Sequence, residues 1–588
     1  MLRPRFLCLV AALGLMACDE SAQQAGPIEQ ALQALASGNG YGAEVAFREA
    51  LSRGTPRELV AAGMGEAELQ QGQLAEARKW LEPGLFDEGT AGRGFHMLGR
   101  LEMQSDDLPA AGTAFDAALL HIPDDPELWV DIARLRYRGG EQAQAVDAAM
   151  RAIELGPDNP AALLLRGQLA RDSEGMAAAL PYFERAVAKQ PENLELLSDY
   201  AATLVELGSA REGLAVVRKI VALDPGNPRA FFIQAVIAAR GGEFDLSRRL
   251  LMRSGDIGRD VPAGILLGGL IDLEEGNFAS AAQAFDKLHR LQPENRQVRE
   301  LLARSLDLGG NHRELIHRFD DEGRLLSASP YLRVLVARSH EALGDREQAA
   351  ALLDRSAESL DGSLVAMQPA ISLEVSSRRG VEQGEDALST VRGLIVTGNR
   401  RGALSAARAF AARYPGSADA NALLGDARLA NRQVTGALEA YRASARIRNP
   451  WPLTRRMIAA LRASGRRGEA IELAQAQLAG SPSNGELSSM LARFAYDAGD
   501  FDRAAALLDQ AMRHGFERDP EVLALRASVA KRQGHDEVGR RYAYRAVEIL
   551  PQYSSALQAL AMVERNETSR SALAKARRLD GSAAFARR

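Results

Sequence analysis

The residues in this 588-residue chain that could carry out catalytic or metal chemistry are few, and their spacing does not suit it. His312 and His317 stand five positions apart, so on a helix their side chains point about 140° away from each other. They do not form the i, i+4 pair that binds zinc on one helix face, and a surface role is the simpler interpretation. The acidic pairs Asp124-Asp125 and Glu274-Glu275 lie beside predicted turns, where solvated carboxylates are more common than catalytic ones.

The glycine-rich segment Gly38-Asn39-Gly40-Tyr41-Gly42 has the composition of a phosphate-binding loop. Such a loop follows a β-strand and opens a helix, whereas this segment lies in a predicted turn between two helices. We therefore predict no phosphate site there. The sequence indicates a protein that is not an enzyme and that needs no metal and no cofactor.

A fixed period of 34 residues organises the elements that must position any binding site. Pro123, Pro157, Pro191 and Pro225 are separated by this interval without insertion. In steps of 34, a small residue recurs at Ala31, Gly65, Gly99, Ala133, Gly167, Ala201, Ala235, Gly269, Ala303 and Ala337. Seven residues after these, eight of the ten positions are glycine, the residue that most readily closes a helix in the left-handed conformation. A period of this length is the sequence signature of stacked repeats.

Each period predicts one helix, a glycine turn and a second helix. The second helix presents a small residue twelve positions after the first small one, as at Ala111, and in most repeats a bulky residue four positions later, as at Phe115. This order of small, turn, small, bulky and proline positions resembles the tetratricopeptide repeat family. The resemblance implies an all-α, right-handed α-solenoid of helix pairs. The departures are local: Asp106 and Glu174 replace the turn glycine, and Leu315 replaces a small packing residue.

Two arrays of such helix pairs account for most of the chain. We place about ten repeats in residues 28–361 and about five in residues 386–551, followed by capping helices and a tail in residues 552–588. Between the arrays the 34-residue period is lost, since Ile371 stands where the period predicts a small residue and Arg378 where it predicts glycine. Residues 362–385 are therefore predicted to be a linker or a distorted repeat. The arrays leave no segment of about 100 residues for a separate catalytic domain.

Residues 1–18 have the features of a targeting segment, with a basic start, a short apolar run and the tetrapeptide Leu15-Met16-Ala17-Cys18. The apolar run is too short to span a bilayer comfortably. The tetrapeptide resembles the lipobox of bacterial lipoproteins, which implies that Cys18 is lipid-modified. The alternative is an ordinary secretory signal with a chance cysteine. Since Cys8 would leave with the signal, the mature chain would retain one cysteine and form no internal disulfide.

Asp19 directly follows the predicted lipid-modified cysteine. In some bacterial lipoproteins an aspartate at this position signals retention in the inner membrane. We therefore expect a membrane lipoprotein that faces the periplasm, anchored in the inner rather than the outer membrane. Residues 19–27 form a polar tether of at most roughly 30 Å, which would hold the solenoid close to the membrane.

Charge is divided unevenly along the chain. Residues from 383 onward contain 32 Lys/Arg and 21 Asp/Glu, a net charge of +11, which leaves −16 for residues 1–382 within the whole-chain −5. The densest basic cluster has no acid within it and comprises Arg442, Arg446, Arg448, Arg455, Arg456, Arg462, Arg466 and Arg467. The positive electrostatic potential of such a cluster can attract an anionic polymer, lipid headgroups or an acidic protein. The alternative is that these arginines lie on ordinary solvated helix faces.

The resemblance also implies a concave groove lined by the first helix of each repeat, chiefly three residues before and one residue after the first small position. One groove zone is basic with aromatic character and comprises His96, Arg100, Arg134, Tyr137 and Arg138. A second zone is apolar and comprises Phe232, Val236, Leu266, Leu270 and Leu273. Exposed apolar residues would suit a partner helix or an extended peptide, unless these side chains pack within the repeat stack. The Lys/Asn clamp with which chaperone-binding members hold a terminal carboxylate is absent from these positions.

These features predict a non-enzymatic scaffold lipoprotein that binds envelope proteins in its concave groove and contacts the membrane through its lipid anchor. Bacterial lipoproteins that it resembles assemble envelope machines, and exopolysaccharide export or an exosortase-type system is the context we expect. One alternative is a chaperone-like holder of unfolded envelope proteins, and another is an enzyme with a site embedded in the repeats. We expect no nucleic-acid partner.

Overall fold

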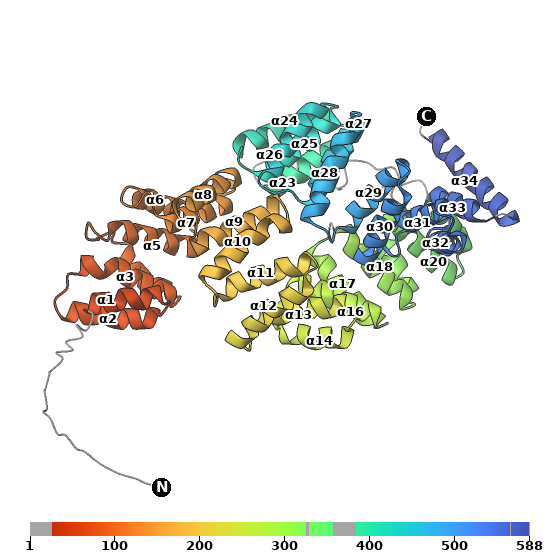
Figure 1. Ribbon diagram of the computed structural model, residues 1–588. Coiled ribbons are helices and arrows are strands. Elements are labelled where there is room, and N and C mark those ends of the chain that lie inside the picture. Colours follow the sequence, from red (N-terminus) through yellow and green to blue (C-terminus); the bar gives the residue numbers. More distant parts are fainter. Residues whose placement is uncertain (1–25, 294, 325–327, 357–383, 565, 587–588) are drawn as a thin grey trace, which may run out of the picture. The chain divides into compact units, whose positions relative to one another are not determined.

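The computed structural model describes residues 26–293, 295–324, 328–356, 384–564 and 566–586, and helices dominate these ranges (Figure 1). They contain no strand and no helix both long and apolar enough to cross a membrane. The prediction of an all-α solenoid of helix pairs is confirmed. The predicted signal at residues 1–18, nearly all of the tether at 19–27 and nearly all of the linker at 362–385 lie outside the described residues.

Ten helix pairs follow one another between residues 27 and 355. The first five are α1 (Pro27–Ala36) with α2 (Gly40–Ser52), α3 (Arg57–Gln70) with α4 (Leu74–Leu81), α5 (Ala91–Gln104) with α6 (Leu108–Leu119), α7 (Pro126–Arg138) with α8 (Gln142–Leu155), and α9 (Pro160–Ser173) with α10 (Met176–Lys189). The next five are α11 (Leu194–Glu206) with α12 (Ala210–Leu223), α13 (Pro228–Arg240) with α14 (Phe244–Arg253), α16 (Pro262–Glu274) with α17 (Phe278–Leu291), α18 (Arg296–Leu308) with α19 (His312–Arg324), and α20 (Pro330–Ala342) with α21 (Arg346–Arg355). The single-turn helix α15 (Asp256–Arg259) interrupts the series after α14.

The second array begins at α23 (Gly384–Val396), which pairs with α24 (Arg400–Arg413). It continues through α25 (Ala418–Ala430) with α26 (Val434–Ala445), α27 (Trp451–Ala463) with α28 (Arg467–Gly480), α29 (Gly485–Asp497) with α30 (Phe501–Ala511), and α31 (Pro520–Arg532) with α32 (Asp536–Ile549). A kinked turn, η1 (Met512–Phe516), in which His514 and Gly515 have non-helical dihedral angles, follows α30. The pair α33 (Ser554–Val563) and α34 (Glu567–Ala586) comes last.

The 34-residue period has a direct packing cause, because the first small residue of a repeat lies under the bulky residue sixteen positions later. A Cβ atom on Gly65 would lie 2.3 Å from Cδ2 of Leu81, and one on Gly167 would lie 2.6 Å from Cε1 of Phe183. Interiors are packed too tightly to absorb such overlaps. Each pair of positions therefore has to be filled by one small and one larger side chain.

The departures from the repeat pattern alter single positions and leave the helix pairing intact. Asp106 adopts a φ of 63° where most repeats have glycine, a conformation that aspartate tolerates better than most side chains. In the fifth repeat the positive φ lies at Gly175 (102°) instead of Glu174. Leu315 is fully buried in a core shared with neighbouring repeats.

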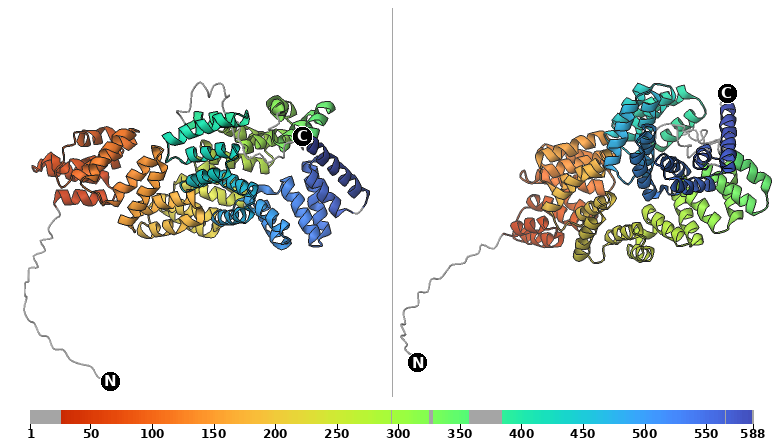
Figure 2. Two further views of the ribbon diagram at one scale, coloured as in Figure 1. Left: turned by 90° about the horizontal axis from the view of Figure 1, so that it is seen from above. Right: turned by 45° about the vertical axis from the view of Figure 1, so that its right-hand side comes forward.

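The chain divides into two compact units, Met1–Leu135 and Arg136–Arg588. The division falls within α7, inside the predicted first array, and not at the irregular segment. In the second unit the two arrays contact each other, with α28 beside α10 (Figures 1 and 2). Val334 of α20 also shares a buried apolar cluster with α31, α32 and α33.

Candidate binding groove

The two groove positions of each first helix differ in exposure. From the second to the tenth repeat, the residue three before the small position is buried in six of nine cases: Ala62, His96, Val130, Leu164, Ser198 and Val334. The residue one after the small position is at least partly exposed in all nine: Glu66, Arg100, Arg134, Gln168, Ala202, Val236, Leu270, Arg304 and Arg338. The groove wall is therefore formed mainly by the second set.

Asp131 gathers three of the predicted basic groove residues around its carboxylate in the first unit. Nε2 of His96 lies 2.9 Å from Oδ2, Nε of Arg100 lies 3.4 Å from the same oxygen, and Nη1 of Arg134 lies 3.1 Å from Oδ1. His96 is buried, with its ring against Phe115 and its Nε2 on the aspartate of the next repeat. Its prediction as an open groove residue is wrong, because the repeat stack covers this position.

The charge of the Asp131 cluster is set by the balance between burial and its cationic neighbours. Burial alone would raise the pKa of the carboxyl group, but the hydrogen bond to His96 and the charges of Arg100 and Arg134 hold the pKa below its usual value. An ionised Asp131 then faces two guanidinium groups whose side chains are 41% and 37% exposed. Each guanidinium group has five N–H donors, so the single Asp131 carboxylate cannot accept hydrogen bonds from all of them. Arg100, Arg134 and Asp131 together carry a net charge of +1, and the remaining N–H donors are free to bind a ligand.

Tyr137 and Arg138, the remaining members of the basic zone, lie in the last turn of α7 and belong to the second unit. Tyr137 is partly buried, and burial raises the pKa of its phenol. The contacts to Asp131 within the first unit come from His96, Arg100 and Arg134. The structure therefore brings together three of the five predicted residues.

A second buried carboxylate, Asp199 in the second unit, repeats this design. Nε2 of Gln168 donates a 2.8 Å hydrogen bond to Oδ2, and Nη atoms of Arg171 and Arg229 lie 3.6 and 3.7 Å from Oδ1. Sequence reasoning missed both aspartates. A signal was present, since Asp199 and Asp131 each stand two residues before the small position of their repeats.

The predicted apolar zone is largely covered by neighbouring repeats. Leu273 is 4% exposed and belongs to the core shared by α16 to α21. Its prediction as a groove residue is wrong, because α16 turns it toward that core. Phe232, Val236 and Leu266 are partly buried against adjacent clusters, and Leu270, at 37% exposure, is the most open of the five. Packing within the repeat stack accounts for most of this zone.

The groove of the tenth repeat is filled by the chain itself. Val334 is completely buried in a cluster with Leu523 of α31 and Leu557 of α33. Arg338, at the next groove position, donates a 2.5 Å hydrogen bond to the carbonyl oxygen of Glu548. A partner segment has no access to these positions while the two arrays are in contact.

The clustered arginines of the second array are mostly paired with carboxylates. The pairs are Arg442–Glu469 at 3.8 Å, Arg448–Asp419 at 2.6 Å, Arg455–Glu486 at 2.9 Å, Arg456–Asp426 at 2.5 Å, Arg466–Glu469 at 2.6 Å and Arg467–Asp497 at 3.3 Å. Arg462 lies over the ring of Phe494, with 5.5 Å between its Cζ and the ring centroid. Of the two interpretations of this cluster, these ion pairs favour ordinary solvated helix faces over an open basic patch, because folding brings carboxylates beside the arginines.

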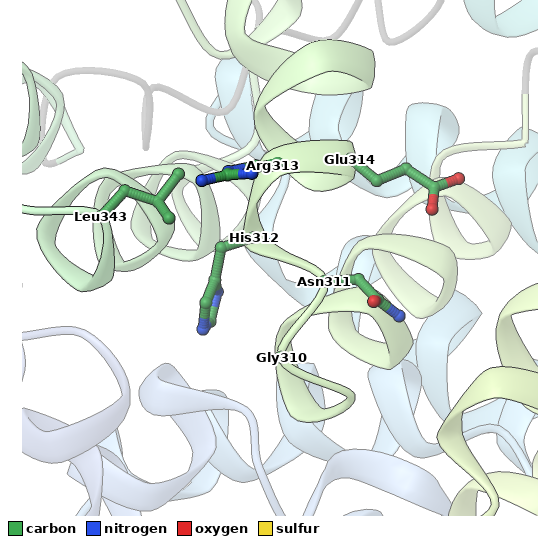
Figure 3. Close-up of a pocket in the computed structure, with 6 residues that line it drawn as sticks. All are labelled: Gly310, Asn311, His312, Arg313, Glu314 and Leu343. Carbon is green, nitrogen blue, oxygen red and sulfur yellow. The ribbon is translucent and has the colours of Figure 1, made fainter.

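A shallow pocket of about 390 Å³ lies at the start of α19 and is lined by Gly310, Asn311, His312, Arg313, Glu314 and Leu343 (Figure 3). Nδ1 of His312 lies 3.2 Å from Oγ of Ser339. Arg313 extends toward Leu343, whereas Glu314 points the opposite way. The charged groups do not converge on one point. In the described ranges, moreover, no group of three or more His, Cys, Asp or Glu side chains could hold a metal ion.

Comparison with known families identifies the repeats in both arrays. Two family models, each described as a tetratricopeptide repeat, match the chain. One covers residues 171–237 and 461–529, and the other covers residues 96–160, 131–194 and 390–450.

Individual relatives are distant. The TPR repeat-containing protein YpiA of Bacillus subtilis (strain 168) is 26% identical over 162 residues, which are 25% of this chain, and the match spans 38% of YpiA. The solved structure of pilF from Pseudomonas aeruginosa is 17% identical and covers 35% of this chain and 94% of its own, with a TM-score of 0.31. YrrB, described as a TPR protein with an unusual peptide-binding site, is 21% identical and covers 29% and 89%, with a TM-score of 0.25.

Proposed function

We propose that this chain, which belongs to the tetratricopeptide repeat proteins, is a non-enzymatic scaffold lipoprotein that binds a protein segment in the groove of its first array. The observation that carries the binding site is the Asp131 carboxylate with Arg100 and Arg134 beside it on the groove wall. The carboxylate fixes two half-exposed guanidinium groups in place before any ligand arrives. Pre-positioned donors lose less conformational freedom on binding.

The partner segment that fits this site carries acidic side chains. Hydrogen bonds from guanidinium to carboxylate groups are about twice as strong as neutral ones, and the site has a net charge of +1. A chaperone-like holder would need an open apolar groove, and the apolar zone around Leu273 is largely covered. The paired arginines of the second array give little support to a separate site for an anionic polymer.

The cell envelope is the setting that we propose for this scaffold. The tetrapeptide Leu15-Met16-Ala17-Cys18 and the following Asp19 support a lipid anchor at Cys18 in the inner membrane, with the repeats in the periplasm. Within that setting we propose a role in assembling an export machine, with exopolysaccharide export or an exosortase-type system as the preferred context.

The binding site is tested by removing the two exposed arginines without reversing their charge. Arg100→Gln with Arg134→Gln removes two positive charges beside Asp131. The matched control, Arg48→Gln with Arg53→Gln, removes two exposed arginines from the end of α2 in the same unit. Both proteins and the wild type are crosslinked in intact envelopes, and the captured partners are identified by mass spectrometry.

We expect the groove variant to recover its principal partner about tenfold less than wild type, a loss of about 1.4 kcal/mol, while the control recovers it fully. The thermal unfolding midpoint of each variant is measured alongside, so that loss of folding is recognised. Equal recovery by the two double variants would refute the groove site.

A further inference from the structure

Two contacts between the arrays of the second unit differ in their main chemistry, although Arg338 and Gln552 add hydrogen bonds to Glu548 and Asp354 beside the apolar one. One is an apolar cluster in which Val334 of α20 is buried with Leu523 and Leu550, while Tyr331 and Leu353 pack against its edge. This contact excludes water from large side chains. Separating it would return buried apolar surface to water, which is unfavourable in proportion to the area.

The other contact is a polar seam between α8 to α10 and the loops that precede α25 and α27. Ala143 near the start of α8 donates its backbone N–H to the carbonyl oxygen of Gly416 (3.0 Å). In return, Ala418 at the start of α25 donates its N–H to Oε1 of Gln142 (2.9 Å). These two N–H groups lack partners within their own helices. Each array thus caps a helix of the other.

The seam continues at the end of α9. Asn449 donates its backbone N–H to the carbonyl oxygen of Asp172 (2.8 Å), in the last turn of that helix. Beside it, Gly175 and Gly480 bring the two backbones together. A Cβ atom on Gly175 would lie 2.9 Å from Cα of Gly480, and one on Gly480 would lie 2.9 Å from the carbonyl oxygen of Glu174. Only residues without side chains allow this approach.

We propose that the apolar cluster is a hinge and the polar seam a latch, so that the arrays separate at the seam while they stay joined at the cluster. Water can replace each hydrogen bond of the seam, because its donors and acceptors are backbone and amide groups. Opening leaves every repeat folded. It exposes the starts of α8 and α25 and the end of α9 to solvent.

Hydrogen–deuterium exchange of the full chain measures whether the latch is closed. The amide hydrogens of Ala143, Ala418 and Asn449 form the hydrogen bonds across it, so their exchange rates report its opening. Gly480→Leu places a side chain against Glu174 and should speed the exchange of these three amides about tenfold or more. The amides of α20 and α31 at the hinge should keep their wild-type rates. Gly468→Leu is the control, because Gly468 lies on the same helix with open space around it.

The outcomes separate the hinge-and-latch device from a uniform interface. Unchanged exchange at the three amides in Gly480→Leu, or equal acceleration at the hinge, would overturn the proposal. If Gly480→Leu does not fold, Gln142→Ala removes the acceptor of Ala418. Acceleration of all three amides then supports a cooperative latch. Acceleration of Ala418 alone shows independent contacts and overturns it.

Discussion

Gly99 lies directly beneath the ring of Phe115, sixteen residues later in the same repeat. A Cβ atom on Gly99 would lie 2.2 Å from Cε1 of the ring, a distance at which the ring or the helix has to move. Glycine lowers the intrinsic stability of a helix interior by about 1 kcal/mol relative to alanine. Its presence in the middle of α5 is explained by this contact.

Gly99→Ala should therefore destabilise the protein although alanine is the better helix former. Overpacking costs about 1–3 kcal/mol and outweighs the gain in helix propensity. Gly112→Ala is the control on α6, where the nearest atom to the new Cβ is Cδ2 of Leu135 at 3.8 Å, and it should be neutral or stabilising. Denaturant unfolding measures both. Combining Gly99→Ala with Phe115→Val should recover stability, and a stable Gly99→Ala single variant would contradict this packing.

Two arginines of the second array should differ in their contribution to stability despite their similar sequence context. Arg456 is 17% exposed and pairs with Asp426, which also accepts a 2.7 Å hydrogen bond from the hydroxyl group of Tyr441. Burial and the nearby charge of Asp426 raise the pKa of that phenol, so Tyr441 remains a donor. Arg456→Gln should cost about 1.5–3 kcal/mol, the range for hydrogen bonds to charged groups.

The comparison is Arg467→Gln. Arg467 is 55% exposed and lies 3.3 Å from Asp497, and exposed ion pairs contribute about 0–1 kcal/mol. Chemical denaturation of the full chain distinguishes the two variants. Equal losses would mean that Arg456 and Asp426 are not a structural pair.

The helix pairs could be predicted because their contacts are local in sequence. Gly99 and Phe115 belong to one repeat, so their contact is encoded by a fixed spacing that recurs along the chain. The turn at Gly175 could not be placed, because it is shifted by one residue at a point where the backbone meets Gly480, far away in the chain.

The candidate site was predicted only in part because its chemistry depends on convergence between helices. The spacing placed Arg100 and Arg134 at equivalent positions of successive repeats but gave no indication that both would lie beside Asp131. The two interpretations of the arginine cluster could not be separated for the same reason. Its acids lie outside the run, and Arg456 and Asp426 are 30 residues apart. The seam pair Gln142 and Ala418 is separated by 276 residues, and no period relates them.

The lipid anchor can be tested independently of the groove. Cys18→Ser should abolish incorporation of a labelled fatty acid and leave the precursor unprocessed, because the thiol is the group that the lipid modifies. Cys8→Ser, within the same predicted signal, should leave labelling unchanged. Labelling is followed by gel electrophoresis of whole envelopes. A Cys18→Ser protein that still carries the label would contradict the lipobox interpretation.

The Asp131 cluster predicts a specific dependence of stability on pH. The pKa of this carboxyl group is lowered in the folded chain, whereas an aspartate in the unfolded chain has a pKa of about 3.9. A lowered folded-state pKa means that the ionised form stabilises the fold. This stabilisation is fully present above the unfolded value and is lost as the pH falls through the folded value.

Asp131→Asn removes that contribution and should lower the free energy of unfolding at neutral pH by about 1–3 kcal/mol. The difference from wild type should shrink below about pH 4, as Asp131 of the wild type becomes protonated. Asp116→Asn, at an exposed position of α6, should track wild type at every pH. Unfolding curves between pH 2 and pH 7 measure all three proteins. A difference between Asp131→Asn and wild type that stayed constant over this range would mean that the carboxylate charge does not hold the cluster together.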